Sequence, residues 1–365
     1  MNMMDYIREQ PDVFARALAN RASLAAPFVE LFRAVEPDRL YIVASGTSRN
    51  ASATAAPFMS RVLGMDVTVS APSRLYAVYG QRPLMIYVSQ GGNSTNTIAA
   101  MERFAAIPSL AMTGDRGRIC DLCQHYTAIP CGPETVGPKT KGYTMTILGL
   151  YLLALETARA TGRLSEADYE TYMSTLTAAG QAMAANVEST IAWQKVNDEA
   201  QRGLKAAYLV GKGQALRIAQ EGALKLQETL LIPTAAFDFE EFLHGPTSSI
   251  KPDVAGFYLV PPEGDPDRRR MLDLMAYHRS VCPHVYTLGG PDAADPRDCT
   301  LQVTGRWYTQ PFEYILPMQV VSAAVPAELG IENASFATFH KLDMLLNIKF
   351  KGADGETEYV QPGTH

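Results

Sequence analysis

The fold is decided by the stretch LYIVASGTSRN, which occupies residues 40–50. Its first five residues form an apolar run with the length and composition of a buried strand. A turn that contains glycine follows, and an alanine-rich segment with helical character comes next. A strand, a glycine turn and a helix in this order begin a βαβ unit. The stretch therefore predicts a parallel sheet covered by helices.

The same pattern continues along the chain and then returns. Further apolar runs are typical of strands, and the unit begins again with AYLVGKGQA at residues 207–215. A repeat over so long a distance indicates two similar domains rather than a solenoid. The additional strands are predicted at residues 67–70, 84–88, 109–112, 254–260, 285–288 and 300–303.

These patterns predict an α/β protein with two copies of one parallel-sheet unit. Residues near the N-terminus and between the two copies have helical spacing and little turn chemistry. The expected organisation is N-terminal helices over residues 1–35, a first α/β domain over 36–160, connecting helices over 161–200, a second α/β domain over 201–330 and a tail over 331–365.

Composition excludes several classes of protein. The 365 residues carry a formal net charge of −6, which argues against a general nucleic-acid binder. No apolar run reaches the length of a membrane span, and the first residues lack the pattern of a secretory signal. Cys120 and Cys123 form a C-x-x-C pair that nothing downstream completes as a zinc site, so we expect reduced thiols and no metal. We expect a cytoplasmic protein.

Two loops that follow predicted strands are rich in small hydroxylated residues. They span Ser45–Ser48 and Ser89–Thr97, and Gly46, Gly91 and Gly92 let the backbone approach a ligand. Serine and threonine before a helix are also ordinary N-caps. Two such loops at one end of a sheet favour phosphate binding. Neither loop has the lysine of a nucleotide-binding P-loop, and the turn at residues 211–213 lacks the third glycine of a dinucleotide fingerprint.

A set of ionisable residues follows the second glycine turn. Glu221, Lys225 and Glu228 have the spacing that places side chains on one face of a helix. The simplest interpretation is a solvated charged face, but small and apolar residues surround them. His244 precedes a Gly-Pro turn a little further on. Carboxylate, ammonium and imidazole are the groups that open a sugar ring and move a proton between adjacent carbons.

Three motifs resemble the SIS (sugar isomerase) domain family. They are EGALKLQE at residues 221–228, EEFLHGP at 240–246 and SQGG at 89–92, and the resemblance extends over about residues 35–345. It is strongest to the isomerase half of the glucosamine-6-phosphate synthases. The resemblance implies two tandem SIS domains, each a doubly wound, flavodoxin-like parallel sheet, in a homodimer whose site is completed across subunits. It implies no cofactor.

The resemblance also implies roles for individual residues. A glutamate in the place of Glu228 moves the proton, a histidine in the place of His244 opens the ring, and a lysine in the place of Lys225 assists. A segment like 134–141 lines the same pocket. Lys341 stands at the offset of the family's ring-opening lysine. The residues expected to bind substrate are Ser45, Gly46, Thr47, Ser48, Ser89, Gln90, Gly91, Ser94, Gly137 and Glu221.

The chain also departs from the family pattern. The phosphate loop SQSGET is SQGGNS at residues 89–94, and the C-terminal motif around the ring-opening lysine is replaced. We expect no glutaminase activity. The sequence predicts a phosphosugar isomerase, deaminase or fructosamine-6-phosphate deglycase that acts on an amino-sugar or ketosamine 6-phosphate. Two alternatives stay open: a sensor that binds a sugar phosphate without catalysis, and a purely structural role for the charged residues.

Overall fold

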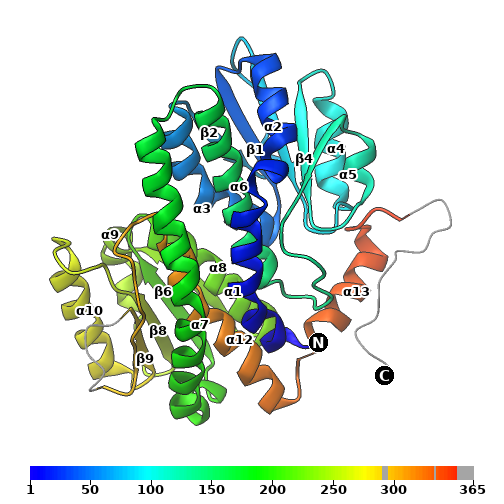
Figure 1. Ribbon diagram of the computed structural model, residues 1–365. Coiled ribbons are helices and arrows are strands. Elements are labelled where there is room, and N and C mark those ends of the chain that lie inside the picture. Colours follow the sequence, from blue (N-terminus) through cyan, green and yellow to red (C-terminus); the bar gives the residue numbers. More distant parts are fainter. Residues whose placement is uncertain (290–294, 333, 352–365) are drawn as a thin grey trace. The chain divides into compact units, whose positions relative to one another are not determined.

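The computed structural model of the protein describes residues 1–289, 295–332 and 334–351 (Figure 1). The chain forms two compact units. Unit 1 consists of Asp12–Ser174 and the C-terminal residues from Phe336, and unit 2 consists of Asn2–Pro11 and Thr175–Ser335. The boundaries fall inside α1 (Met3–Ala19), α7 (Glu166–Arg202) and α13 (Ala334–Leu346).

Unit 1 is built on a five-stranded sheet in the order β2-β1-β3-β4-β5, in which every neighbouring pair is parallel. From β1 the chain continues to β2 at one edge of the sheet, and it then crosses to β3 on the other side of β1. This order has a topological switch point between β1 and β3. The elements are α2 (Arg21–Val35), β1 (Arg39–Ala44), α3 (Gly46–Leu63), β2 (Val67–Ser70), η1 (Pro72–Arg74), β3 (Pro83–Val88), α4 (Thr95–Arg103), β4 (Ser109–Thr113), α5 (Arg118–Asp121), β5 (His125–Ala128) and α6 (Lys141–Ala160).

Helices cover both faces of this sheet, which is why its strands are apolar almost throughout. On one face α6 packs between α2 and α3. On the other face α4 and α5 close a core that includes Tyr41, Tyr87 and Ile119. The helix α6 is buried along nearly its whole length, so its position is fixed by the surrounding core.

Unit 2 repeats the same topology. Its sheet has the order β10-β9-β8-β6-β7, also parallel throughout, and its switch point lies between β6 and β8. The helices α8, α11 and α12 pack together, while α9 and α10 belong to a core with Tyr258 and Met271. The elements are β6 (Ala206–Gly211), α8 (Gln214–Thr229), β7 (Thr234–Asp238), α9 (Phe239–Leu243), η2 (Pro246–Ser249), β8 (Val254–Leu259), α10 (Arg268–Val281), β9 (Val285–Leu288), β10 (Asp298–Cys299), α11 (Gln310–Glu313) and α12 (Leu316–Leu329).

The fold class predicted from the sequence is confirmed, and one predicted strand is wrong. Residues 300–303 form no strand, because β10 ends at Cys299. The side chain of Asn186 forms two hydrogen bonds with the backbone of Gln302. The Asn186 amide donates to the Gln302 carbonyl at 2.8 Å, and the Asn186 oxygen accepts from the Gln302 N–H at 2.7 Å. Backbone groups bound in this way cannot join a strand ladder. The strands β5 and β7 were not predicted.

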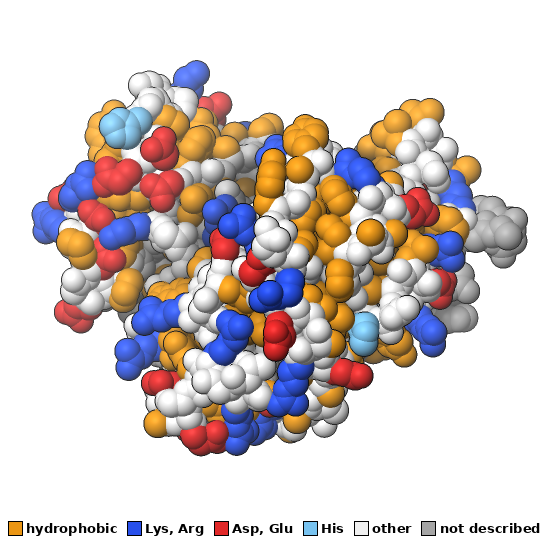
Figure 2. All heavy atoms as spheres, turned by 90° about the horizontal axis from the view of Figure 1, so that it is seen from above, with side chains coloured by type: hydrophobic (Ala, Val, Ile, Leu, Met, Phe, Trp, Pro, Cys, Tyr) orange, Lys and Arg blue, Asp and Glu red, His pale blue; other side chains and the backbone are white. Residues whose placement is uncertain are grey.

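The surface agrees with the modest negative charge of the chain. On the face drawn in Figure 2, acidic and basic side chains are interspersed, and neither sign forms a continuous field. Among the described residues, the helices are too short or too polar to cross a lipid bilayer.

Candidate functional site

The two hydroxyl-rich loops of unit 1 leave the sheet side by side. Ala44 ends β1 and Val88 ends β3, and these two residues are register partners. Ser45 and Ser89 are therefore the first residues beyond the carboxyl edge at the switch point. Ligands of open parallel sheets bind at this edge.

The structure bears on whether the serines of these loops are N-caps. Ser45 and Ser94 occupy the N-cap positions of α3 and α4. In both of these fully described helices the serine side chain forms no capping hydrogen bond with a backbone N–H group. The Ser45 hydroxyl instead accepts a hydrogen bond from Asn96 Nδ2 at 2.9 Å, and the oxygens of Ser94 and Ser89 lie 3.3 Å apart. The two loops are thus joined, and the helical N–H groups are left for other acceptors.

The second loop is held in place by a close approach of two backbones. Gly92 has a φ of +65°, and a β-carbon there would lie 2.7 Å from the α-carbon of Gly117. The backbone N–H of Arg118 donates to the side-chain oxygen of Asn93 at 2.8 Å, and the N–H of Ile119 donates to the carbonyl of Gly92 at 3.0 Å. Glycine is required at such a position, and the loop is a fixed element of the fold.

The side chain of Gln90 is turned toward its own unit. Its Nε2 lies 3.1 Å from Sγ of Cys131, and β-carbons added at Gly114 or Gly142 would strike its amide group. Burial raises the pKa of the Cys131 thiol to about 11, so this sulfur is a neutral thiol at physiological pH. In this structure Gln90 braces the loop that carries Ser89.

A buried carboxylate organises the segment before α6. Glu134 accepts hydrogen bonds from the backbone N–H groups of Thr140, Lys141 and Gly142 and from the Thr140 hydroxyl, at distances of 2.7–3.2 Å. It caps the first turn of α6, a task that helices usually give to the N-cap side chain. Lys139 donates to the carbonyl of Glu134 at 2.5 Å. Gly137, a predicted substrate-binding residue, is exposed in the same loop.

In unit 2 the predicted acid–base residues form one cluster on α8. Lys225 and Glu221 are each 1% exposed, and the Lys225 ammonium lies 3.5 Å from the Glu221 carboxylate. The ammonium also donates to Glu228, whose side chain is 35% exposed. The interpretation as a solvated charged face is wrong for Glu221 and Lys225. A cation buried in this way is stabilised by its paired carboxylates, and breaking such a pair costs about 3–5 kcal/mol.

His244 lies at a helix end of the same unit. It occupies the C-cap of the short helix α9, and its backbone N–H donates to the carbonyl of Glu241. Its side chain is exposed, so the imidazole is accessible. The adjacent Gly245 has a φ of +132°, a value that side-chain-bearing residues avoid, and it turns the chain directly after the histidine.

Comparisons with known proteins find relatives and similar solved structures. No family model matches the chain. It is 29% identical over 266 residues to glutamine–fructose-6-phosphate aminotransferase (isomerizing) from Fusobacterium nucleatum. The matched region is 69% of this chain and 43% of the relative. A crystal structure from Clostridium difficile 630, provisionally described as a phosphosugar isomerase, has a TM-score of 0.84 and 27% identity and covers 91% of this chain and 94% of that one.

The chain is similar to proteins of the SIS domain family. A second crystal structure, provisionally described as a sugar-binding protein from Salmonella typhimurium LT2, has a TM-score of 0.77 and 28% identity and covers 88% of this chain and 99% of that chain. The chain spans about half the length of the curated relatives it matches, 43% and 56% of the first two.

The loops and the charged cluster belong to different units. The serine loops and Gly137 lie in unit 1, whereas Glu221, Lys225, Glu228 and His244 lie in unit 2. Lys341 lies on α13, and its side chain is exposed.

Two residues at the serine loops were not found from the sequence. Lys349 lies with its Nζ 3.3 Å from the Ser94 oxygen, and Asn96 joins the two loops. Lys349 belongs to no recognisable motif. Asn96 does lie inside the predicted loop, and its amide could have been weighed there as a hydrogen-bond donor.

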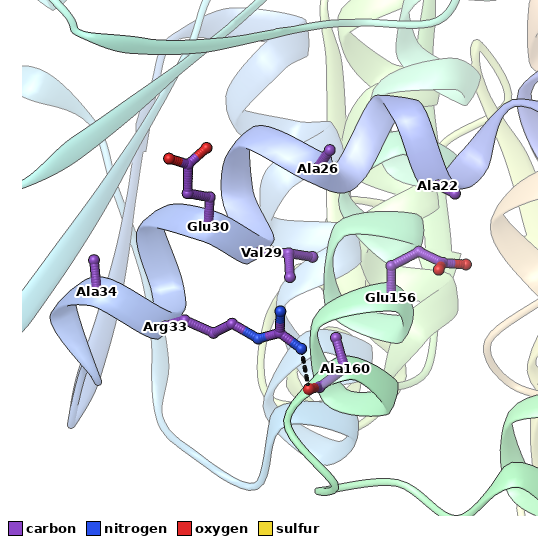
Figure 3. A pocket seen from close by; sticks show the side chains of 8 residues that line it. All are labelled: Ala22, Ala26, Val29, Glu30, Arg33, Ala34, Glu156 and Ala160. Carbon is purple, nitrogen blue, oxygen red and sulfur yellow. Dashed lines mark hydrogen bonds between the residues drawn. The ribbon is translucent and has the colours of Figure 1, made fainter.

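A hollow of about 680 Å³ lies elsewhere in unit 1, between α2 and α6 (Figure 3). Two of its charged side chains are engaged within the protein: Arg33 donates to the carbonyl of Ala160, and Glu156 pairs with Arg21 at 3.2 Å. None of the predicted site residues lines it, so we assign it no part in the chemistry. It is lined by Ala22, Ala26, Val29, Glu30, Arg33, Ala34, Glu156 and Ala160.

Proposed function

We propose that this protein is a phosphosugar enzyme of the isomerase and deaminase type, and that its substrate is an amino-sugar or ketosamine 6-phosphate. The observation that carries the proposal is the cluster on α8, where a fully buried ammonium lies between a buried carboxylate and a partly exposed one. The names of its relatives support it, since the Fusobacterium protein is an isomerizing aminotransferase for fructose 6-phosphate and the Clostridium structure is described as a phosphosugar isomerase.

The geometry suits Glu228 for moving a proton. Lys225 donates to its carboxylate and fixes its orientation, while the exposed part of the side chain faces solvent and can reach a ligand. In the proposed reaction the carboxylate takes a proton from one carbon beside the carbonyl of the open-chain sugar. It returns that proton to the former carbonyl carbon, while the proton of the hydroxyl or amine on the first carbon passes to the former carbonyl oxygen, so that the double bond moves by one carbon and the atoms balance. Glu221 forms an ion pair with Lys225 at 3.5 Å.

His244 is proposed to open the sugar ring. An accessible imidazole can donate a proton to the ring oxygen and accept one from the anomeric hydroxyl, which yields the open-chain carbonyl that Glu228 requires. Lys341 is proposed as an additional ring-opening group, and we propose a homodimer that completes the site across subunits. The residues proposed to bind the sugar phosphate are Ser45, Gly46, Thr47, Ser48, Ser89, Gln90, Gly91, Ser94, Gly137 and Glu221.

The test is product analysis by mass spectrometry with Glu228→Gln. The panel consists of glucosamine 6-phosphate, fructosamine 6-phosphate and 6-phosphorylated ketosamines of amino acids, which separates isomerase, deaminase and deglycase products. Loss of a general acid–base group is expected to lower turnover by about 10²- to 10⁴-fold, with little change in ligand binding. The matched control is Glu199→Gln, which alters an exposed carboxylate on α7. Full turnover by the Glu228 variant would refute the assignment.

A sensor is the second candidate, and the Salmonella structure favours it because that protein is described provisionally as sugar-binding. A sensor needs the hydroxyl loops but not proton transfer. A saturable rise in melting temperature with fructose 6-phosphate, together with no product from any member of the panel, would establish the sensor and reject the enzyme.

A further inference from the structure

A short piece of chain near the C-terminus pairs with the second hydroxyl loop of unit 1. We call Asn347–Phe350 the C-terminal segment. Ser94 and Lys349 form an antiparallel bridge, the N–H of Thr95 donates to the carbonyl of Ile348 at 3.2 Å, and the N–H of Phe350 donates to the carbonyl of Asn93 at 2.7 Å. These backbone bonds fix the C-terminal segment against the loop, whatever side chains it carries.

The pairing places one ammonium group among the loop hydroxyls. Nζ of Lys349 lies 3.3 Å from Oγ of Ser94, which itself lies 3.3 Å from Oγ of Ser89. The side chain of Lys349 is half-buried. Two hydroxyl groups and an ammonium therefore converge beside the N-terminus of α4. Together they offer the donors and the positive charge that a phosphate group accepts.

The charged groups at this place are two ammonium groups and one carboxylate, so the sum of their charges is positive. Burial lowers the pKa of Lys349; Asp343 opposes this shift, and the like charge of Lys139 adds to it. The Asp343 carboxylate is already engaged by the backbone N–H of Lys349 at 2.7 Å. Two ammonium groups and one carboxylate lie in a partly desolvated place. An anion that enters there stabilises the ammonium groups.

We propose that Lys349 is a phosphate-binding residue of this protein, acting with Ser89 and Ser94. The inference rests on the proposed function, because it concerns the phosphate end of the same substrate. It adds that the C-terminal segment supplies a cation to loops that otherwise present neutral donors. A doubly charged phosphate monoester is therefore preferred over the same sugar without phosphate, and the preference depends on one lysine.

The test compares the full chain with three variants by isothermal titration, with inorganic phosphate, fructose 6-phosphate and fructose as probes. Lys349→Met is expected to weaken binding of both phosphate probes by about 10- to 100-fold, the range for a hydrogen bond to a charged group. Lys349→Arg is expected to retain most of the binding. The matched control is Lys351→Met, because Lys351 lies two residues further on and its Nζ is placed 3.7 Å from Met344 Sδ.

The outcomes separate this inference from the proposed function. If the wild type binds the phosphate probes and Lys349→Met binds them equally well, the inference is overturned and the proposed function stands. The inference also fails if Lys351→Met weakens binding as much as Lys349→Met, because the effect is then one of overall charge. A wild type that binds neither phosphate probe overturns both. In turnover assays Lys349→Met should raise KM for the phosphorylated substrate and leave kcat nearly unchanged, whereas a misfolded variant would lower kcat.

Discussion

Replacing Glu134 with glutamine tests how the fold holds the segment before α6. The carboxylate accepts four hydrogen bonds: one Oε1 atom takes the N–H and hydroxyl of Thr140 and the N–H of Lys141, and Oε2 takes the N–H of Gly142 at 2.7 Å. Glu134 is only 7% exposed. A glutamine can keep its oxygen on the Thr140 side, but it must then point its NH₂ group at the N–H of Gly142.

The expected loss follows from this arrangement. One buried donor is left without an acceptor, at a cost of about 1–3 kcal/mol. The remaining bonds lose their charge assistance, and the N-terminus of a 20-residue helix loses a nearby negative charge, for about 1 kcal/mol more. The total is about 2–4 kcal/mol. For a unit of this size, each kcal/mol lowers the melting temperature by about 2–4 °C.

Differential scanning calorimetry is the suitable assay, because two units can unfold in separate transitions. Glu134→Gln should lower one transition by about 4–16 °C. The control is Glu102→Gln, which changes an exposed carboxylate on α4 and should stay within about 0.5 kcal/mol of the wild type. A Glu134 variant that melts within 2 °C of the wild type, by the conversion above, would refute the capping role.

Two further predictions concern a glycine and a histidine. Gly92→Ala should destabilise the protein by more than about 2 kcal/mol, because the new β-carbon would meet the Gly117 backbone at 2.7 Å. Gly46→Ala has a similar φ of +53° but open space, so thermal melts should show a loss of only about 1 kcal/mol; equal losses would contradict the steric argument. Burial lowers the pKa of His278. The unfolded chain therefore binds the extra proton first, and stability should be fully present above pH 6.5, near the unfolded pKa, and fall below it. Urea unfolding at pH 7.5 and 5.5 should show this loss in the wild type and a smaller one in His278→Gln, and identical losses would refute it.

The sequence predicted the fold well because both sheets depend on local apolar runs. Strands β2 and β9 have the predicted bounds, and β1 and β3 differ from prediction by one residue at one end. The missed strand β5 (His125–Ala128) is a half-exposed edge strand with a single fully buried residue, so it lacks a continuous apolar run. The wrong strand at 300–303 has the apolar pattern, but Asn186, which is distant in sequence, binds its backbone.

The site was predictable only where its residues lie on one element. Spacing along α8 was enough to group Glu221, Lys225 and Glu228, because helical periodicity is local. Lys349 is separated from Ser94 by most of the sequence, and the two residues meet through backbone pairing that no sequence motif indicates. Placing Lys341 by its offset along the sequence assumes a path for the tail. Residues 334–346 are helical and advance about 1.5 Å each rather than the 3.3 Å of an extended chain.

The two sheets share one topology but carry different chemistry at equivalent edges. At the switch point of unit 1 the loops after β1 and β3 present hydroxyl groups. At the corresponding edge of unit 2, Lys212 follows β6, and its ammonium lies 2.9 Å from Asp265 and 2.6 Å from Asp267 in the loop after β8. The pKa of Asp267 is lowered by Lys212 and by Arg270, so the Asp267 carboxylate stays charged beside the lysine. An edge filled in this way offers no surplus positive charge to a phosphate. The duplication therefore provides the scaffold twice, and the described residues beyond the strands give the two edges different charges.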